Sequence, residues 1–521
     1  MFSDRKIFHR YIYIFALIFL GVMLPWSKFI ISVAQFILIG NWLLEGDFKR
    51  KLKVLKQRKS IIAFITIILV HFVWLFNTSD IKYALHDIQI KIPLLVLPLI
   101  IGTTTILSKK EFHIILKFFV ASVFTASLFS IAIYLGYTKF EYTGYRDLSV
   151  FISHIRFSLM IVMAIVIALY LSDNNKYKLF FIPIALWLII FLFFLQSYTG
   201  IVIFAIVTFI FSITTIIKLK NNSSRLISII SFIILLILIV VWFNNSINNI
   251  HNTNKANNIH TLDEFTKNNN KYLNDTTQTI TENGTLVTIY INNYELKKEW
   301  QKRSNLAFDS TDYRNNSLKF TLYRYLASKG LRKDSAGLSQ LTDKDIRNIE
   351  KGMPNYLFEN KFSPYVILYK LLWELESTNN KQDINNKSIL QRVEYFKIGK
   401  QIFTDNFFLG VGTGDIQQKF DEYYEKNNSV LTKENRHRTH NQLLTFLITF
   451  GFFGFSIIIF GFTYPLFFEQ NKEKLLLILF LVIAFLSFLD EDTLETQQGV
   501  TFVAYFYSLL VFGYKKITSN N

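Results

Sequence analysis

Apolar blocks separated by short polar segments run through the first 243 residues of the chain and resume at residue 442. A helix needs about 20 mainly apolar residues to cross the hydrocarbon core of a membrane. The predicted spans are residues 11–25, 28–44, 60–77, 91–107, 116–136, 156–172, 179–196, 199–217, 226–243, 442–468, 475–489 and 500–514. The pattern predicts an all-α polytopic membrane protein with about 12 transmembrane helices.

The composition agrees with this class of protein. Hydrophobic residues make up 51% of the chain, and the mean hydropathy is positive. There is no cysteine, so neither disulfides nor thiolate metal sites can stabilise the fold. The first apolar block ends at residues 24–28 without a small-residue cleavage site, and we expect it to remain as an anchor.

The Lys and Arg residues of the short connections predict the orientation. Short cytoplasmic connections carry an excess of these residues. With the N-terminus inside, every inner connection is basic, whereas the short outer connections carry few Lys or Arg. Both termini are therefore predicted to be cytoplasmic. Much of the formal charge of +18 lies in the inner connections, which favours contact with anionic lipid headgroups over nucleic acid.

A long outer segment separates the ninth and tenth spans. The chain thus divides into transmembrane helices over 1–243, a periplasmic loop domain over 244–441 and a second membrane part over 442–521. Residues 244–293 are rich in Asn and Thr and are expected to be weakly ordered, apart from a strand or hairpin arm near 285–291. From residue 294 onward the pattern predicts a helical domain. Its landmarks are a helix end near Gly330, a capped start at Thr342, and helices over 365–375 and 393–403.

Basic and titratable residues gather where this segment returns to the membrane. His437 and His440 alternate with Arg436 and Arg438, and Asn441 precedes the apolar run. An imidazole ordinarily titrates near pH 6.5 and suits general base catalysis near neutrality. A polar cap at the membrane interface would explain Asn441 alone. The two histidines, three residues apart on one face of a predicted helix, and the interleaved arginines favour a site for chemistry.

Glycines flank this region on both sides. Gly451 and Gly454 predict close packing of the helix that follows. Upstream, Gly410, Gly412 and Gly414 look like a phosphate-cradling loop, but no Lys-Ser/Thr pair follows them and nucleotides are absent from the predicted outer face. We interpret them as a tight turn that lets the backbone pack beneath the membrane surface, with contact to a lipid diphosphate as a secondary role.

Two further arginines are candidates for binding a diphosphate. Arg156 follows His154 at the outer end of the sixth span, where it is either an interface anchor or an inward-facing anion clamp. Arg392 lies on the helix that leads to the glycine turn. A salt bridge with Glu394 or Asp405 would explain Arg392 equally well.

Acidic residues offer weaker candidates for a metal site. Residues 490–492 read Asp-Glu-Asp, a spacing that suits Mg²⁺ or Mn²⁺, but a solvated acidic turn is the commoner explanation and we favour it. His437 and His440 with Asp415 or Glu434 have a permissive spacing for zinc, yet the neighbouring arginines would repel a cation. We predict no metal and no cofactor.

The residues around His440 resemble a known family. His440-Asn441, nine intervening residues and then Gly451-Phe452-Phe453-Gly454 resemble the signature of the bacterial O-antigen ligase and O-antigen polymerase superfamily. Residues 405–412 look like the turn that precedes this signature in the family. The twelve spans, the orientation and the long outer loop are similar too. Family members often carry an arginine near the turn at 197–200, and this chain has none there.

The resemblance implies a metal-independent, inverting glycosyltransferase of the bacterial inner membrane, with its active site on the periplasmic face. Such an enzyme moves a glycan from an undecaprenyl-diphosphate carrier to a hydroxyl acceptor. It implies His440 as the base. Diphosphate binding and its support are then expected from Arg156, Arg392, Arg436, Arg438, His437 and Asn441. The leading expectation is O-antigen ligation to the lipid A core in lipopolysaccharide biosynthesis.

Two related activities stay open. An O-antigen or exopolysaccharide polymerase would extend the same lipid-linked glycan, and a protein O-oligosaccharyltransferase would use hydroxyls of proteins. Motif and topology are shared among these enzymes, so the sequence offers no discriminator. A non-enzymatic flippase or transporter is less favoured, because no charged residue lies well inside the predicted spans except at their outer ends, and no broken helices are placed symmetrically in two halves.

Overall fold

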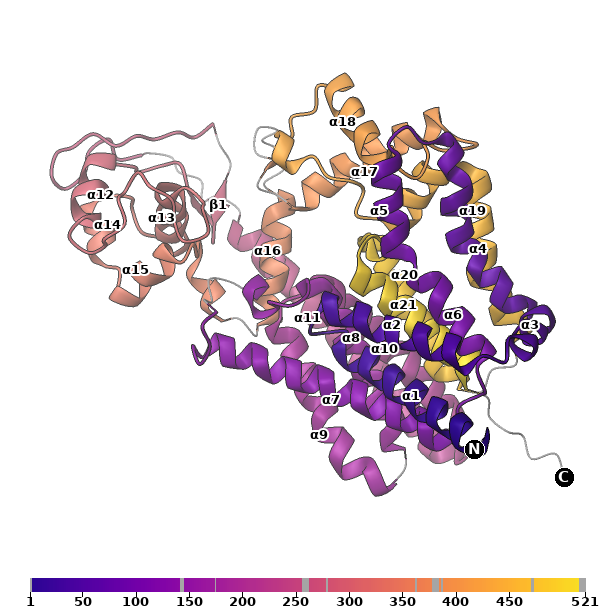
Figure 1. Ribbon diagram of the computed structural model, residues 1–521. Coiled ribbons are helices and arrows are strands. Elements are labelled where there is room, and N and C mark those ends of the chain that lie inside the picture. The colour runs from indigo at the N-terminus through magenta and orange to yellow at the C-terminus, as the bar shows by residue number, and fades with distance from the viewer. Residues whose placement is uncertain are drawn as a thin grey trace. The chain divides into compact units, whose positions relative to one another are not determined.

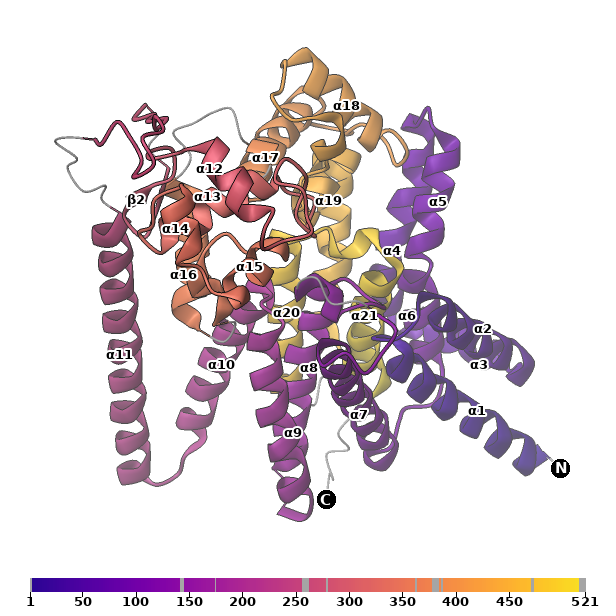
Figure 2. The same cartoon turned by 90° about the vertical axis from the view of Figure 1, so that its left-hand side faces the viewer.

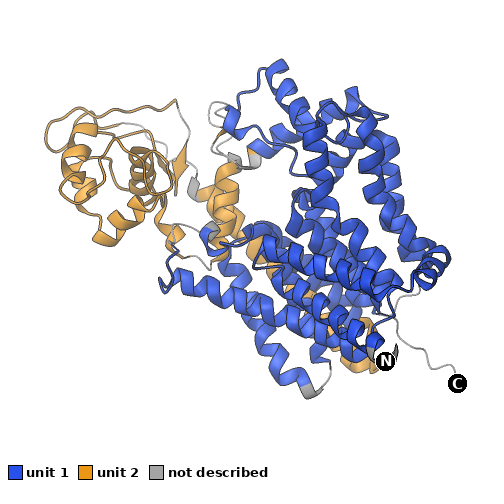
Figure 3. Cartoon of the chain, in the orientation of Figure 1, with its two compact units in different colours: residues 1–215, 391–521 blue, residues 216–390 orange. Residues whose placement is uncertain are grey.

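The chain forms two compact units. The computed structural model describes residues 2–140, 145–173, 175–254, 262–277, 280–360, 363–376, 384–385, 388–469 and 473–514. One unit comprises residues 1–215 and 391–521, and the other comprises residues 216–390 (Figure 3). The predicted three-part division of the chain stays a prediction.

Helices make up the first unit. Its N-terminal part contains α1 (Phe2–Met23), α2 (Lys28–Glu45), α3 (Phe48–Gln57), α4 (Lys59–Val73), α5 (Ile81–Lys91), α6 (Pro93–Thr103), α7 (Lys109–Tyr134), α8 (His154–Ser172), α9 (Asn175–Phe194) and α10 (Tyr198–Lys218). Its C-terminal part contains α17 (Ser388–Asp405), α18 (Ile416–Lys426), α19 (Gln442–Phe468), α20 (Lys474–Asp490) and α21 (Gln497–Ser508). Figure 1 shows their arrangement.

The all-α membrane class is confirmed. Among the described residues, ten helices are long and apolar enough to cross a membrane, and they correspond to the first ten predicted spans. The helices at the last two predicted spans are shorter. α20 has 17 residues, and α21 has 12 before it continues as a π-helical turn over Leu509–Gly513.

The fourth span starts earlier than predicted. Residues 77–90 were expected to form an outer connection, but α5 already begins at Ile81. Asp80 caps this helix, because its Oδ1 accepts a hydrogen bond from the backbone amide of Tyr83 at 2.9 Å. Asp87 and Lys91, one turn apart, form a buried ion pair, so their charges do not end the helix. The expectation that no charged residue lies well inside a span is therefore wrong.

α8 lies at the centre of the first unit. It packs against α7, α9 and α20 (Figure 2), and most of its residues are buried. Its sequence from Phe157 to Leu171 is apolar on every side, as expected for a helix surrounded by other helices. α8 therefore holds its first turn, which carries Arg156, in a fixed position at one end of the bundle.

The second unit joins a long apolar helix to a set of short elements. They are α11 (Asn222–Asn254), β1 (Thr281–Glu282), β2 (Thr285–Leu286), α12 (Asn293–Trp300), α13 (Leu318–Ser328), α14 (Ser335–Ser339), α15 (Asp343–Glu350) and α16 (Pro364–Glu376). The predicted hairpin arm is confirmed where β1 and β2 pair antiparallel. The predicted end near Gly330, the cap at Thr342 and the helices now seen as α16 and α17 are also confirmed.

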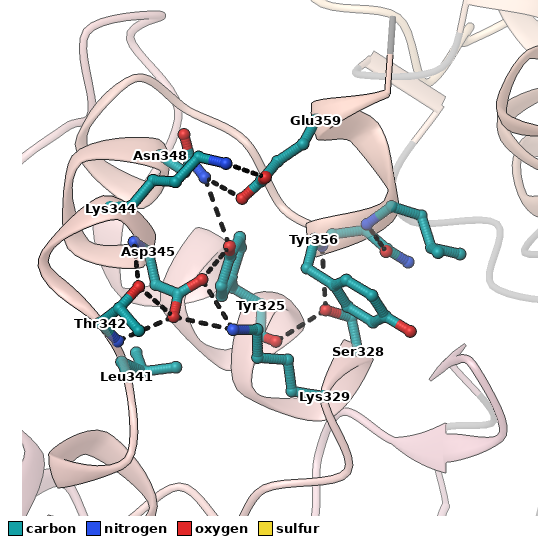
Figure 4. Close-up of polar contacts among 12 residues, drawn as sticks. Tyr325, Ser328, Lys329, Leu341, Thr342, Lys344, Asp345, Asn348, Tyr356 and Glu359 are labelled. Carbon is teal, nitrogen blue, oxygen red and sulfur yellow. Dashed lines mark hydrogen bonds and ion pairs between the residues drawn. The ribbon is translucent and has the colours of Figure 1, made fainter. Parts of the chain in front are cut away.

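Asp345 links α13 to α15 within this unit (Figure 4). Its carboxylate accepts hydrogen bonds from Tyr325 Oη at 2.6 Å and from Lys329 Nζ at 2.7 Å, and it completes a capping box with Thr342. Burial alone would raise the pKa of Asp345, but these hydrogen bonds more than offset burial and lower the pKa to about 2. The ionised carboxylate of Asp345 thus holds α13 and α15 together.

Candidate functional site

An extended segment over residues 436–440 leads into α19. The expectation that His437 and His440 share a helical face is wrong, because the helix starts only at Gln442. Their rings nevertheless lie 6.1 Å apart. Asn441 is the N-cap of α19, its Oδ1 accepting from the Leu444 amide at 2.9 Å. His440 itself has a φ of +50°, which is uncommon for a residue with a side chain and typical of functional positions.

A second irregularity interrupts α19 itself at Gly451, where φ is +61°. The turn over residues 406–412 fills this break. The amides of Val411 and Gly412 each donate, at 2.9 Å, to a carbonyl of the α19 turn that precedes the break. A Cβ on Gly451 would lie 2.3 Å from Phe408 O, so only glycine fits. The glycine motif thus packs backbone against backbone, and its place beneath the membrane surface stays a prediction.

The remaining predicted glycines also lie at close contacts. A Cβ on Gly410 would approach Gly451 N to 2.5 Å, and one on Gly414 would approach Asp80 O to 2.1 Å. A Cβ on Gly454 would approach the indole ring of Trp74 to 3.0 Å. The predicted close packing is therefore confirmed at both ends of the motif, and it fixes the chain on either side of the segment that bears the histidines.

The side chain of His440 faces an acidic residue at the end of α20. Its Nδ1 lies 3.9 Å from Glu491 Oε2, within ion-pair range but longer than a hydrogen bond. Glu491 Oε1 in turn accepts from Arg392 Nη2 at 3.1 Å. Tyr395, one turn after Arg392 on α17, places its ring 5.7 Å from the His440 ring. Burial raises the pKa of Glu491, but His440, Arg392 and Arg156 outweigh it and lower the pKa, which keeps the carboxylate ionised.

Arg392 does not pair with Glu394 or Asp405, the partners considered from sequence. It forms an ion pair with Asp490 as well as with Glu491. Asp490 also accepts a hydrogen bond from Thr199. Thr199, in the turn at 197–200, thus contacts one of the two carboxylates that Arg392 binds.

Arg156 lies in the first turn of α8, on the same side of the bundle. Its Nε is buried and has no hydrogen-bond partner among the described residues. Glu491 and Asp492 are the carboxylates that act on it electrostatically. Because a buried guanidinium nitrogen normally has an acceptor, this nitrogen is a candidate for binding an anionic ligand.

Arg438 points into a buried ionic network instead. Its Nη1 lies 3.2 Å from Glu495 Oε2, and Lys91 Nζ lies 3.0 Å from the other oxygen of Glu495. Burial lowers the pKa of Arg438, but Glu495 and Asp492 more than offset this effect, so the pKa is raised. Because Arg438 is engaged by a buried carboxylate, it holds the segment in place and is less suited than Arg156 to bind a ligand.

Arg436 and His437 tie the same segment to α18. Arg436 forms an ion pair with Glu425 and donates from Nε to Leu431 O at 3.1 Å. The carbonyl of His437 accepts from Tyr424 Oη at 2.7 Å. Burial and the neighbouring His440 lower the pKa of His437, which favours its neutral form. Arg436 and Arg438 therefore have different partners, whereas His437 and His440 lie together against the ring of Tyr395.

The acidic residues 490–492 are not a solvated turn, so our favoured interpretation of them is wrong. Glu491 and Asp492 are each only 8% exposed. Their burial is compensated by Arg392 and by Thr445, whose hydroxyl donates to Asp492 at 2.7 Å. Within the part of the chain that the structure describes, no group of three or more His, Cys, Asp or Glu side chains is arranged to hold a metal ion.

A comparison with protein families decides how the site is classified. Residues 362–459, which include Arg392, the glycine turn and His440, match the family model described as O-antigen ligase. This stretch of the chain is similar to the O-antigen ligase family. The resemblance predicted from the sequence is thereby confirmed, and with it an O-antigen ligase or polymerase type of function in general. No curated protein matches the chain.

Several residues around the candidate site were missed from sequence. Glu491 was weighed only as a metal ligand, and Tyr395, Glu495 and Lys91 were not considered. The signal for Glu491 was its place in a short outer connection next to an apolar helix. Lys91 and Glu495 carried no such signal, because their pairing joins positions 404 residues apart in the chain.

Proposed function

We propose that the protein is an inverting glycosyltransferase that moves a glycan from undecaprenyl diphosphate to a hydroxyl acceptor, with His440 as general base. The observation that carries this proposal is the placement of His440 next to the ionised Glu491, which is itself bound by Arg392. With Nδ1 facing Glu491, Nε2 is the ring nitrogen left to take a proton. The family match to O-antigen ligase supports the general class of reaction.

The proposed reaction is a single displacement at the anomeric carbon of the glycan. The acceptor oxygen forms a bond to this carbon from the face opposite the diphosphate, and its proton passes to His440. The bond between the anomeric carbon and the diphosphate oxygen breaks, and its electron pair leaves with the lipid diphosphate. A general base at this step typically contributes about 10²- to 10⁴-fold to the rate. Glu491 would stabilise the imidazolium that forms.

The leaving diphosphate gathers negative charge, and arginines are suited to bind it. Arg156 is the first candidate, because its Nε is buried with no hydrogen-bond partner among the described residues. Arg392 is the second, and it must exchange part of its contact with Asp490 for the diphosphate. Arg436 and Arg438 are occupied by carboxylates, and we assign them, with His437 and Asn441, to holding the segment in position.

The acceptor that we propose first is the lipid A core, which makes the reaction the ligation step of lipopolysaccharide biosynthesis. This proposal places the protein in the bacterial inner membrane with both termini in the cytoplasm and the site on the periplasmic face. The basic inner connections support that orientation. Elongation of the lipid-linked glycan or transfer to a protein would use the same donor chemistry, so the product decides among the three.

The test is transfer by the purified protein from a lipid-diphosphate-linked glycan to the lipid A core, with and without EDTA. We expect transfer to survive EDTA and to be lost in His440→Ala. His86→Ala is the matched control, because His86 is an exposed histidine on α5. Transfer abolished by EDTA would point to a metal at Asp490 and Asp492. Full activity of His440→Ala would reject the proposed base, and elongated donor as the sole product would identify a polymerase.

A further inference from the structure

A cavity lies at the end of the first two helices that is far from the candidate site. α1 and α2 pack against each other and are joined by the hinge at residues 24–27. The hinge residue Pro25 lines the same small cavity as Phe157 of α8, the residue that follows Arg156. The cavity lies at the other end, where α1 begins and α2 ends, and has a volume of about 340 Å³. α1 is about 33 Å long, so the cavity and the hinge lie at opposite ends of a helix that is long enough to cross a membrane.

Cations dominate the lining of this cavity. Four basic residues face two carboxylates, those of Glu45 and Asp47. The basic residues are Arg5, Lys6, Arg10 and Arg50. Arg5, Lys6 and Arg10 lie on α1 and Arg50 lies on α3, so two helices supply the positive charge of the cavity.

The four cations differ in how far their charge is already used, and Arg50 is already paired with Asp47 at 2.8 Å. Arg10 binds Glu111 through Nε at 2.9 Å and also contacts the carbonyl of Thr105, so it forms part of the wall. Arg5 donates one hydrogen bond, at 2.7 Å, to a backbone carbonyl of α2. Lys6 makes no hydrogen bond or ion pair within 4 Å with any described residue. Lys6 and the remaining donors of Arg5 are therefore available to an anion.

The inner end of the cavity holds an uncompensated hydroxyl. Tyr13 is 2% exposed, lines the cavity, and its Oη has no hydrogen-bond partner among the residues that the structure describes. Next to it, His9 Nδ1 forms a hydrogen bond with Asn41 Oδ1 at 2.8 Å, and this bond does not use the second ring nitrogen of His9. Buried hydroxyls normally have a partner, so the oxygen of Tyr13 indicates a ligand with hydrogen-bonding oxygens.

Exposed apolar side chains border the same end of the two helices. Phe8 is 61% exposed, Tyr11 is 70% exposed and Leu44 is 70% exposed. These side chains suit contact with acyl chains. A headgroup in the cavity and acyl chains along α1 and α2 would together satisfy the charged and the apolar surfaces.

We propose that this cavity binds the phosphate group of an anionic ligand, and that the apolar border favours a membrane lipid as its source. Basic cavities between transmembrane helices on the cytoplasmic side recognise such headgroups. The site is independent of the glycan transfer proposed above. It uses other residues and acts at the membrane face predicted to be cytoplasmic.

The experiment measures ligand binding to the full-length protein in neutral detergent, with no glycan donor present. Native mass spectrometry and thermal unfolding are compared after addition of phosphatidylglycerol, phosphatidylcholine or inorganic phosphate. We expect phosphatidylglycerol to remain bound and to raise the unfolding temperature more than phosphatidylcholine does. The double variant Arg5→Gln/Lys6→Gln should bind about thirtyfold more weakly, from about fivefold for each cation lost.

Two variants separate a defined site from general surface charge. Lys53→Gln/Lys56→Gln removes the same charge from exposed positions of α3 that do not line the cavity, and it should bind like the parent protein. Tyr13→Phe keeps the charge and the ring and should weaken binding. Phosphate that binds and competes with the lipid would also support the site and would show that the phosphate alone is recognised. Equal weakening in the α3 variant, or no preference for either phosphate ligand over phosphatidylcholine, would overturn the proposal.

Discussion

Replacing Glu491 by glutamine tests the proposed base most directly. The change removes a negative charge that lies 3.9 Å from His440 Nδ1 and keeps the shape of the side chain. Two unit charges about 4 Å apart interact by about 1 kcal/mol in water and about 4 kcal/mol at an effective dielectric of 20. The His440 side chain is 35% exposed and that of Glu491 only 10%, so we take about 2 kcal/mol. Lost stabilisation of the imidazolium in the transition state then lowers kcat about thirtyfold.

The assay is steady-state glycan transfer with the donor varied, so that kcat and KM are obtained separately. The effect should fall on kcat, because the interaction strengthens only as His440 takes the proton. Glu491→Asp retains the charge and should recover part of the activity. Glu434→Gln is the charge-matched control at an exposed position of the same outer segment. A Glu491→Gln enzyme with unchanged kcat would refute the role of this carboxylate, and a change confined to KM would assign it to donor binding through Arg392.

Three further predictions concern stability. Gly451→Ala should lower the unfolding free energy by about 3 kcal/mol or more and depress Tm, because the added Cβ would lie 2.3 Å from Phe408 O and the backbone is left-handed there. Gly40→Ala is the control: Gly40 has open space around it, so this change should be neutral or stabilising. Arg438→Gln should lower the free energy of unfolding in denaturant by about 3–5 kcal/mol, because it leaves the buried carboxylate of Glu495 uncompensated. Arg436→Gln should lower it less, because the partner of Arg436 is exposed. An equal loss in the two variants would contradict the structural role assigned to Arg438. The pKa of Asp345 is lowered in the folded chain, so the stabilisation of α15 by this carboxylate should be complete above about pH 4 and be lost as the pH falls toward 2. Amide hydrogen exchange in α15, corrected for intrinsic rates, should therefore become faster between about pH 4 and pH 2 in the parent protein. In Asp345→Asn the corrected exchange should not depend on pH over this range.

Much of the fold follows from local patterns in the sequence. Long apolar blocks, the cap at Thr342 and the glycine after α13 are local signals, and each marks an element that the structure contains. The start of α5 was misplaced, because the pairing of Asp87 with Lys91 and Glu495 makes charged residues acceptable inside a helix. A hydropathy pattern assigns such charged residues to loops, because it does not take into account the oppositely charged residue that each one pairs with.

The candidate site shows the same division. His440 and the glycines could be found from their spacing along the chain, and Arg392 from its place on the helix before the turn. The burial of Glu491 and Asp492 could not, because it depends on Arg392 and Thr445, which approach from other parts of the chain. Arg436 and Arg438 looked equivalent in sequence, yet an extended backbone directs one to α18 and the other to the Glu495 network.

The break in α19 also bears on how this protein can vary. The turn at 406–412 is hydrogen-bonded through its backbone to α19, the helix that begins at Gln442. The segment between the turn and the helix, residues 413–441, is therefore held at both ends within one unit. Insertions or substitutions in residues 216–390 therefore leave the register of His440 on α19 unchanged. A lineage can exchange the second unit for another of different length while the histidine stays where it is.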